Sequence, residues 1–394
     1  MTRGSPRVVV VATHPIQYHA PWFRALVAEG VDLHVLFAFL PDAERQAAGF
    51  GGRFEWDVPL LDGYPWSILR QARRSPDLSS FSGLRSQGIG RVLATFSPDA
   101  VVLTGWNSLP LLQGHLAAIR LGIPTVVRGE SNALRSRPAW KKTGQRVLLS
   151  SYDAFVSIGK VNREFYERNG VPPERIVDGG YFVDEEHFEV LRTRETPRRE
   201  ELRESWGIPA RACCFLFVGK IQPKKRPLDF VAALDEASRQ LPEDAVFGLV
   251  VGGGELEAEM RRAAEASAAR IVFAGFLNQQ EIGRAYVAAD ALVLPSDGGE
   301  TWGLVVNEAM LFGLPVVVSD RVGCGPDLVD DGETGFVVPC GDVSALGDRL
   351  AELAQGEILR KRMGDHARRR VLEYSPRRGA KATVAAVRIA TGGS

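Results

Sequence analysis

Two glutamates eight residues apart, Glu300 and Glu308, have the surroundings that most clearly suggest chemistry. Glu300 lies in a glycine-containing loop, and Glu308 lies about two turns into the apolar helix expected next, on the same side. The alternative to ligand binding is that Glu300 only stabilises the positive end of the helix dipole and that Glu308 is a surface residue. Glu308, however, lies in an apolar helix, where an unpaired carboxylate is costly. Because carboxylates pair with vicinal diols, the two residues suit two hydroxyl-bearing parts of one ligand.

The start of the same helix offers a site for an anion. Backbone N–H groups without partners and the positive end of the helix dipole meet there. A diphosphate is the natural ligand of such a helix start. The residues expected to bind it are Thr301, Trp302, Gly303 and Leu304.

Positive charge follows another predicted strand, in the segment FVGKIQPKKRPL (217–228). Lys220 comes directly after Gly219, and Lys225 lies five positions later. Two cations beyond a strand end can neutralise a diphosphate leaving group. A lysine-rich loop is more often solvated surface, but the glutamate pair downstream favours phosphate contact. Gly253, in a glycine run after the next strand, would allow close backbone approach to a ligand.

Polar and aromatic side chains also follow three strands of the first half of the chain. The residues after the first strand could donate hydrogen bonds or offer ring faces to a ligand. After the second strand, Trp106 could stack on a sugar, and the third strand is followed by a pair of opposite charges. Each group could equally have a structural role. The residues are His14, Gln17, Tyr18 and His19; Trp106 and Asn107; Arg128 and Glu130.

The elements that position these residues are short, continuous apolar runs alternating with helical patterns. Continuous rather than alternating apolar strands indicate parallel sheets covered on both faces. The first half has five such runs and the second half six. They are Arg7–Ala12, Leu33–Ala38, Ala100–Thr104, Thr125–Arg128 and Ala154–Ile158, then Cys213–Val218, Val246–Val251, Arg270–Phe273, Ala291–Pro295, Pro315–Val318 and Gly335–Val338.

The fold class is therefore α/β, with two Rossmann-like doubly wound domains facing across a cleft where strand-end ligands bind. Between them, Leu191–Ser205 shows no apolar core face and is expected to be a connection or a solvated helix. The arginine-rich tail from Ala345 to Ala390 has a helical pattern. A second basic cluster, Arg135, Arg137, Lys141, Lys142 and Arg146, follows the fourth strand of the first half.

Composition excludes several classes of protein. The chain has 394 residues, with 48 Lys plus Arg against 48 Asp plus Glu, so no whole-protein basic field indicates nucleic acid. No apolar run approaches a membrane span, and the N-terminal apolar stretch is too short for a signal peptide, which predicts a cytoplasmic protein. The four cysteines match no zinc site and no disulfide framework.

The spaced motifs resemble the retaining glycosyltransferases of family 4, which have the GT-B fold. The resemblance rests on Glu300–x7–Glu308, on Ala309-Met310 with Gly313 and Pro315–Val317, and on Asp331–Val338. It is strong over about 215–342 and weak over about 7–188. It implies that Glu300, Lys220 and Lys225 are catalytic, that Glu300 contacts the hexose and Glu308 the ribose, and that Phe276 and Leu277 bind the base.

Two departures from the family pattern stand in the first half. The loop after the first strand lacks the usual Gly-Gly pair, and Gly129 and Glu130 stand where members often have His and Asp. The family's histidine role therefore cannot be transferred. The resemblance implies an acceptor-binding domain over 1–188, a linker over 189–210, a nucleotide-sugar-binding domain over 211–365, and a helical tail over 366–394 that crosses back.

The function expected from these features is retaining, metal-independent transfer of a sugar from a nucleoside diphosphate to a hydroxyl acceptor. No tightly bound cofactor is expected; a UDP-sugar is favoured as co-substrate, with a GDP-sugar as alternative. The acceptor is a small natural product or a glycan precursor, and a lipid-linked acceptor would require peripheral membrane contact. Two other functions stay open: a nucleotide-sugar epimerase of the same fold, and a non-catalytic subunit that binds sugar nucleotides.

Overall fold

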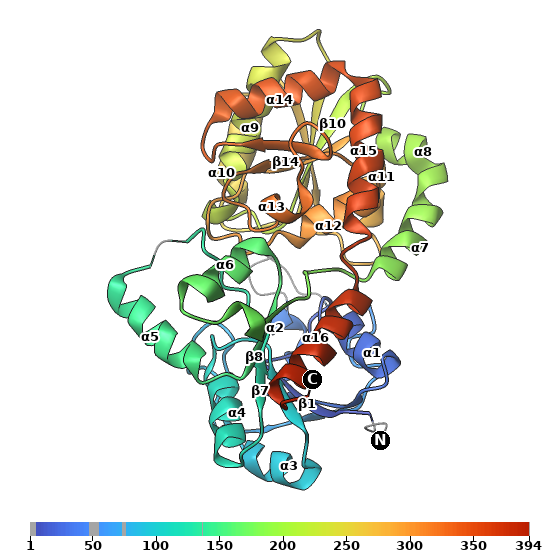
Figure 1. Ribbon diagram of the computed structural model, residues 1–394. Coiled ribbons are helices and arrows are strands. Elements are labelled where there is room, and N and C mark those ends of the chain that lie inside the picture. The colour runs from blue at the N-terminus through green and yellow to red at the C-terminus, as the bar shows by residue number, and fades with distance from the viewer. Residues whose placement is uncertain (1–4, 47–54, 73–75, 136, 394) are drawn as a thin grey trace. The chain divides into compact units, whose positions relative to one another are not determined.

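A computed structural model describes residues 5–46, 55–72, 76–135 and 137–393. Its internal contacts divide the chain into two α/β units, each built on a parallel sheet (Figure 1). The first unit comprises Met1–Asp42, Pro59–Phe182 and Tyr374–Ser394, and the second comprises Ala43–Val58 and Val183–Glu373.

The first unit has a seven-stranded sheet in the order β3-β2-β1-β6-β7-β8-β9, with parallel pairing throughout. Both faces of β1 are buried: Val8 and Val10 pack into one core cluster, and Val9 and Val11 into another. The strands are β1 (Arg7–Ala12), β2 (Asp32–Phe37), β3 (Trp66–Ile68), β6 (Ala100–Leu103), β7 (Thr125–Val127), β8 (Ala154–Ser157) and β9 (Ile176–Asp178). A separate antiparallel pair joins β4 (Arg70–Gln71) and β5 (Ser86–Gln87).

The helices of the first unit include one from the far end of the chain. They are α1 (Ala20–Ala28), α3 (Ile89–Phe96), α4 (Leu109–Arg120), α5 (Ala139–Ser150), α6 (Lys160–Arg168), a short 3₁₀ helix (Pro173–Arg175) and α16 (Pro376–Ala390). Helix α16 contacts α1 and β8. Trp22 Nε1 of α1 donates a hydrogen bond of 3.2 Å to Thr383 Oγ1 of α16, so the last helix is part of this unit's core.

The second unit has a six-stranded parallel sheet in the order β12-β11-β10-β13-β14-β15. Every residue of β10 and β11 is buried, as expected for inner strands covered on both faces. The strands are β10 (Cys213–Val218), β11 (Val246–Val251), β12 (Arg270–Gly275), β13 (Ala291–Leu294), β14 (Val316–Ser319) and β15 (Gly335–Val338).

Helices flank both sides of this sheet (Figure 1). The longer helices are α7 (Glu185–Glu195), α9 (Pro227–Arg239), α10 (Glu257–Glu265), α12 (Leu304–Leu311), α14 (Val343–Gln355) and α15 (Glu357–Val371). The shorter ones are α8 (Arg199–Ser205), α11 (Gly283–Ala288), α13 (Gly325–Leu328) and the 3₁₀ turns Thr196–Arg198 and Pro223–Lys225. Helix α2 (Ala43–Gln46) is assigned to the same unit by its contacts.

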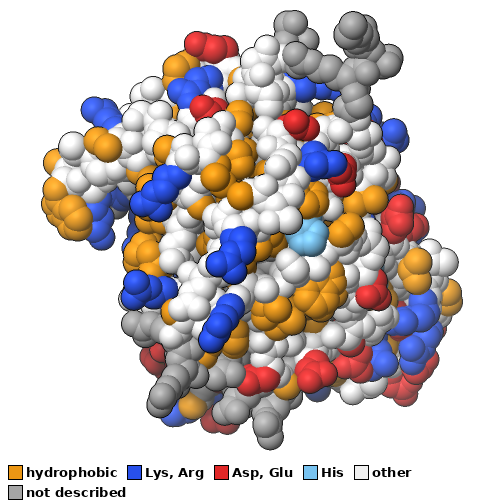
Figure 2. Space-filling model, turned by 90° about the horizontal axis from the view of Figure 1, so that it is seen from below, with side chains coloured by type: hydrophobic (Ala, Val, Ile, Leu, Met, Phe, Trp, Pro, Cys, Tyr) orange, Lys and Arg blue, Asp and Glu red, His pale blue; other side chains and the backbone are white. Residues whose placement is uncertain are grey.

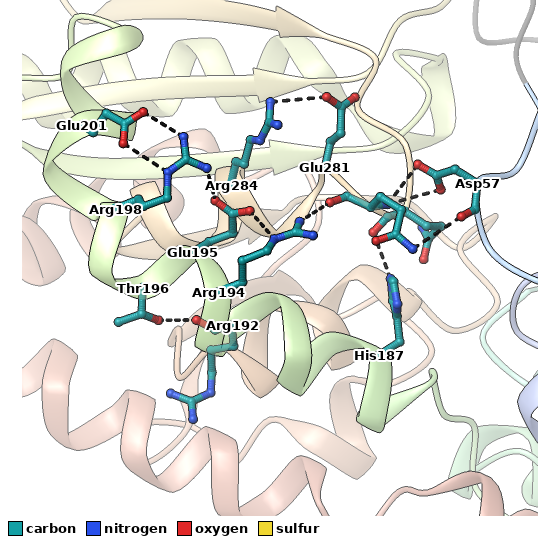
Figure 3. Close-up of polar contacts among 12 residues, drawn as sticks. Asp57, His187, Arg192, Arg194, Glu195, Thr196, Arg198, Glu201, Glu281 and Arg284 are labelled. Atoms are coloured by element: carbon teal, nitrogen blue, oxygen red, sulfur yellow. Dashed lines mark hydrogen bonds and ion pairs between the residues drawn. The ribbon is translucent and has the colours of Figure 1, made fainter.

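The segment expected to be a linker, 189–210, contains the rest of α7 and the whole of α8, which contact α11 within the second unit. Leu191 and Leu202 are buried, so two leucines provide the core contact that the charged pattern concealed. Around them, ion pairs join Glu195 to Arg194 at 2.7 Å and to Arg198 at 3.0 Å (Figure 3). The same network continues to Gln280, which hydrogen-bonds to Arg194 and Asp57.

The unit boundaries also differ from the expected domains. The first unit ends at Phe182 rather than at residue 188, because α7 packs in the second unit. Within the expected tail 366–394, the end of α15 belongs to the second unit and α16 to the first. The described residues contain no helix long and apolar enough to cross a membrane.

Candidate functional site

Lys225 and Glu300 form an ion pair, with 2.5 Å between Nζ and Oε2. Lys225 follows β10 and Glu300 follows β13, two neighbouring parallel strands whose carboxyl ends lie at one edge of the sheet. The chain reverses its direction of winding between these strands, and ligands of doubly wound sheets bind at such a point. Lys225 is 8% exposed and Glu300 is also 8% exposed, so this is a nearly buried pair of charges.

The local fold holds Glu300 in an ionised state. Burial acts to raise its pKa, but the charges of Lys225 and Lys224 and the hydrogen bond from Lys225 outweigh it, so the pKa is lowered. The loop that carries Glu300 is bound to the lysine loop, because Asp297 N donates to Lys224 O at 2.8 Å. A fixed carboxylate beside a fixed ammonium can bind hydroxyl and phosphate groups of one ligand.

Glu308 lies in α12 and is 2% exposed. The hydroxyl of Tyr286, in α11, donates a hydrogen bond of 2.6 Å to Glu308 Oε2. This contact orients the carboxylate of a residue that the apolar helix would otherwise bury at high cost.

A glycine conformation and backbone hydrogen bonds fix the start of α12, where the sequence predicts an anion-binding site. Gly303 adopts φ of 101° at the N-cap, and a Cβ there would lie 2.9 Å from Leu294 Cδ2. The preceding loop is fixed by two backbone bonds, from Gly323 N to Glu300 O and from Cys324 N to Trp302 O. Trp302 itself is buried, and its indole N–H donates a hydrogen bond of 2.8 Å to Asn307 Oδ1. The indole therefore stabilises the first turns of the helix. Thr301 and Leu304 are half-buried on either side of it.

The loops after β10 and β11 touch through glycine backbone. Gly219 N donates to Val251 O at 3.0 Å, and Ile221 N donates to Gly253 O at 2.9 Å. A Cβ at Gly252, where φ is 126°, would lie 2.0 Å from Gly219 O. The glycine run therefore lets two strand-end loops approach; it brings Gly253 and the lysine loop together.

Three other expected residues of this unit line the same strand-end region. Lys220 is half-buried, and desolvation followed by the charge of Lys224 lowers its pKa. Phe276 and Leu277 follow β12 directly and are half-buried. The structure thus places all the expected nucleotide-binding residues after β10, β11, β12 or β13.

In the first unit, His14 and His19 follow β1 and are held as neutral imidazoles. Desolvation lowers the pKa of His14 to about 4, and Thr13 Oγ1 lies 3.0 Å from its Nδ1. Burial, then the charges of Arg128 and His14, lower the pKa of His19 well below its usual value. Gln17 and Tyr18, in the same loop, are half-buried.

Arg128 follows β7 and is only 2% exposed. Its guanidinium lies over the rings of Trp22 at 5.1 Å and Tyr181 at 4.6 Å, and also over Phe182. Such an aromatic enclosure stabilises a cation but leaves it little surface for a ligand. Arg128, expected as a substrate contact, is buried in this enclosure, and its Nε and Nη2 have no hydrogen-bond partner among the described residues.

Glu130, two positions later, remains half-buried and accepts a hydrogen bond of 2.6 Å from the Tyr181 hydroxyl. Trp106, which follows β6, stacks on Phe165 with 6.1 Å between ring centroids and packs against the core. Its neighbour Asn107 is exposed. The structure brings Arg128 and His19 together, whereas Trp106 faces the aromatic side chains of α6.

Sequence reasoning missed the residues that hold these side chains in place. Tyr286, Asn307 and Tyr181 each donate or accept a hydrogen bond within the groups above. Tyr286 and Tyr181 lie outside the motifs, whereas Asn307 lies within the Glu300–x7–Glu308 motif at a position that the motif leaves open. Among the residues the structure describes, no group of three or more His, Cys, Asp or Glu is arranged to hold a metal ion.

Two family models match this chain. The model described as glycosyl transferases group 1 matches residues 198–370, and the glycosyl transferase 4-like domain matches residues 16–177. The chain is also 30% identical to D-inositol 3-phosphate glycosyltransferase 2 of Catenulispora acidiphila, over 96% of this chain and 93% of that protein. It is 35% identical to the phosphatidyl-myo-inositol mannosyltransferase of Mycobacterium leprae, but over 40% of this chain and only 41% of that protein.

Solved structures resemble the chain along nearly its whole length. A glycosyltransferase from Rickettsia africae has a TM-score of 0.74 at 14% identity, with 98% of both chains covered. Anabaena Alr3699/HepE, solved with UDP and glucose, has a TM-score of 0.69 at 16% identity, covering 96% of this chain and 98% of that one. At these identities the likeness concerns the fold.

Proposed function

Because the chain belongs to glycosyltransferase family 4 and has the GT-B fold, we propose that it moves a sugar from a nucleoside diphosphate to a hydroxyl acceptor, retaining the anomeric configuration without a metal ion. The observation that carries the proposal is the buried Lys225–Glu300 ion pair, with Glu308 and the start of α12 nearby in sequence. With these residues, each of the three parts of a sugar nucleotide, the hexose, the diphosphate and the ribose, has a side chain or backbone group that can bind it.

Each of these residues has one task in the proposal. Glu300 accepts hydrogen bonds from the hexose hydroxyls, and Glu308 accepts those of the ribose diol. Lys225, Lys220 and the first amides of α12 bind the diphosphate and stabilise the charge it gains as it leaves. Phe276 and Leu277 contact the base, and Gly219 and Gly253 allow the backbone to approach the phosphates.

The transfer itself breaks the bond between the anomeric carbon and the phosphate oxygen and forms a bond from that carbon to the acceptor oxygen. The acceptor attacks on the face from which the diphosphate leaves, which retains the configuration. Its proton passes to the departing phosphate, so no separate base is required. Lysine ammonium groups supply the positive charge that a divalent cation supplies in other transferases.

The donor we favour is a UDP-sugar, because the structurally similar Anabaena protein was solved with UDP and glucose. The acceptor we favour is a hydroxyl of a small polyol phosphate, since the relative aligned over nearly its whole length is a D-inositol 3-phosphate glycosyltransferase. In the first unit, Glu130, His14, Gln17, Tyr18 and Asn107 retain exposed or half-buried surface for such an acceptor.

The test is thermal stabilisation by UDP, GDP, ADP and dTDP, followed by transfer assays with the matching sugars in EDTA. Stabilisation by one nucleotide, turnover in EDTA and an axial or equatorial product bond matching the donor would support the proposal. Glu300→Gln should lower the transfer rate at least about a hundredfold while the protein still binds nucleotide. Binding without any transfer or hydrolysis would instead indicate a non-catalytic subunit.

A further inference from the structure

Helix α5 of the first unit exposes apolar side chains that no described part of the chain covers. Trp140 is 72% exposed and Val147 is 69% exposed, whereas Leu149 on the same helix is 1% exposed. The two exposed residues are seven positions apart, about two turns, and so lie on one side of the helix. Isolated apolar side chains are common on surfaces, but a tryptophan and a valine aligned on one helix form a face.

The surroundings of this face carry a single sign of charge. From Ser131 to Ser150 the sequence has five cations, Arg135, Arg137, Lys141, Lys142 and Arg146, and no acidic residue. By helical geometry, Lys141 and Arg146 flank the line from Trp140 to Val147 on opposite sides. In Figure 2, orange and blue side chains stand together at the left edge, the side on which Figure 1 places α5.

A pocket of about 360 Å³ adjoins the same helix. Its lining includes Arg135, Arg137, Lys142, Arg146 and Arg168, of which only Arg168 has a carboxylate partner among the described residues, Glu164. Arg137 lies over Phe165 at 4.8 Å and donates to Asn132 O at 2.9 Å, which fixes it beside Arg135. Desolvation, and then the charge of Arg135, lower the pKa of Arg137. Cations held together at such a cost favour an anionic ligand.

We propose that α5 docks on an anionic lipid surface, with Trp140 and Val147 inserted among the headgroups and the surrounding cations on lipid phosphates. Tryptophan prefers the membrane–water interface, and an apolar helix face flanked by lysine and arginine is typical of interfacial helices. Charge favours this partner over a second copy of the chain, because two such faces would bring ten cations together. The inference does not depend on the transfer reaction.

The test uses the full chain and sedimentation with lipid vesicles. Binding is expected to vesicles containing about a third phosphatidylglycerol, to fall with added salt, and to be absent with phosphatidylcholine alone. Lys141→Gln combined with Lys142→Gln should weaken binding about 25-fold, since each cation near an anionic surface contributes about fivefold. Trp140→Ala should weaken it roughly tenfold.

Matched controls lie on α15, where Ile358 is 88% exposed and Lys361 and Arg362 are exposed. Ile358→Ala and the double variant Lys361→Gln with Arg362→Gln should bind vesicles as the unchanged protein does. No binding to anionic vesicles at low salt, or equal losses in the α5 and α15 variants, would overturn the proposal. If the α5 variants change the molecular mass in light scattering but not vesicle binding, a second copy covers this face and the lipid is excluded.

Discussion

Tyr286 and Glu308 come from two different helices and meet through a hydrogen bond of 2.6 Å from the phenol to the carboxylate. Both side chains are buried. Tyr286 also stacks on Phe312, with 5.2 Å between ring centroids, so the donor is itself fixed in position. The orientation of the Glu308 carboxylate is therefore set by the protein before any ligand binds.

Removing that donor should weaken nucleotide binding more than turnover. Tyr286→Phe is expected to raise the Kd for the nucleoside diphosphate about tenfold, because the loss of a hydrogen bond to a charged group costs about 1.5 kcal/mol. The value of kcat at saturating donor should change little, since ribose contact is the same in ground and transition states. Calorimetry and steady-state kinetics measure the two effects.

Tyr152→Phe is the matched control for this variant, because the Tyr152 hydroxyl is buried without a hydrogen-bond partner among the described residues. It should leave the nucleotide Kd unchanged. A tenfold change in kcat for Tyr286→Phe with an unaltered Kd would show that Glu308 acts in the chemical step instead.

Breaking the Lys225–Glu300 pair should cost more stability than removing both of its members. Lys225→Met leaves a buried carboxylate, which typically costs about 3–5 kcal/mol, whereas Lys225→Met with Glu300→Gln should cost less. In the unchanged protein the pKa of Glu300 is lowered, so its contribution to stability is present above about pH 4.5 and is lost as the pH falls. Denaturant melts at pH 7 measure the first effect, and melts of the unchanged protein at a series of pH values from 5 downward measure the second.

In the single variant, burial of Glu300 acts without the charge of Lys225, so the pKa of the carboxyl should rise. Lys225→Met should then be less destabilised, relative to the unchanged protein, at pH 5 than at pH 7. Equal free energies of unfolding for the single and double variants would contradict the buried ion pair.

The start of α12 should tolerate no side chain at Gly303. Gly303→Ala adds a Cβ at φ of 101°, 2.9 Å from Leu294 Cδ2, and should cost about 2–4 kcal/mol from backbone strain and overpacking together. Nucleotide binding should fall too, because the first amides of the helix must shift. Chemical denaturation and nucleotide titration measure the two effects.

Gly332→Ala provides the comparison for backbone strain alone. Gly332 has φ of 79° and nothing within 4 Å of an added Cβ. It should cost about 1 kcal/mol and leave nucleotide binding intact. Equal costs at the two glycines would mean that the contact with Leu294 is relieved by movement.

The buried His115 should make stability depend on pH in the first unit. Desolvation lowers its pKa to about 4, and its ring stacks on Tyr152 at 3.8 Å. Because the unfolded chain binds the proton first, stability is full above about pH 6.5 and falls as the pH drops toward 4. His115→Gln should make this fall shallower, by up to about 1.4 kcal/mol per pH unit, in denaturant melts. Parallel curves for the two proteins would exclude His115 as the cause.

The sequence allowed prediction of both sheets because their inner strands are continuous apolar runs. Cys213–Val218 and Val246–Val251 have the same bounds in the structure as in the prediction. Strands β3 and β9 were missed, since each has three residues at a sheet edge and no such run. Helix α8 was obscured because Leu202 is its one buried apolar residue.

In the candidate site, a motif and a strand end coincide at Lys225 and at Glu300, and the structure places these two residues in contact. Their roles in binding and catalysis stay predictions. Prediction could not find Tyr286, because its neighbours are apolar and its partner lies 22 residues away. For Arg128, residue type and position suggested a substrate contact. Its enclosure depends on Trp22 and Phe182, which only the folded chain brings beside it.

The packing of α16 in the first unit has a consequence for synthesis on the ribosome. Phe182 packs against α16 so closely that a Cβ on Gly379 would lie 2.1 Å from its ring, and Trp22 bonds to Thr383, 361 residues later. Domains usually fold from the N-terminus as they emerge. Here the unit that is translated first cannot form its contacts with α16 until the second unit has been made, so its nascent form lacks part of the packing around Trp22 and Phe182.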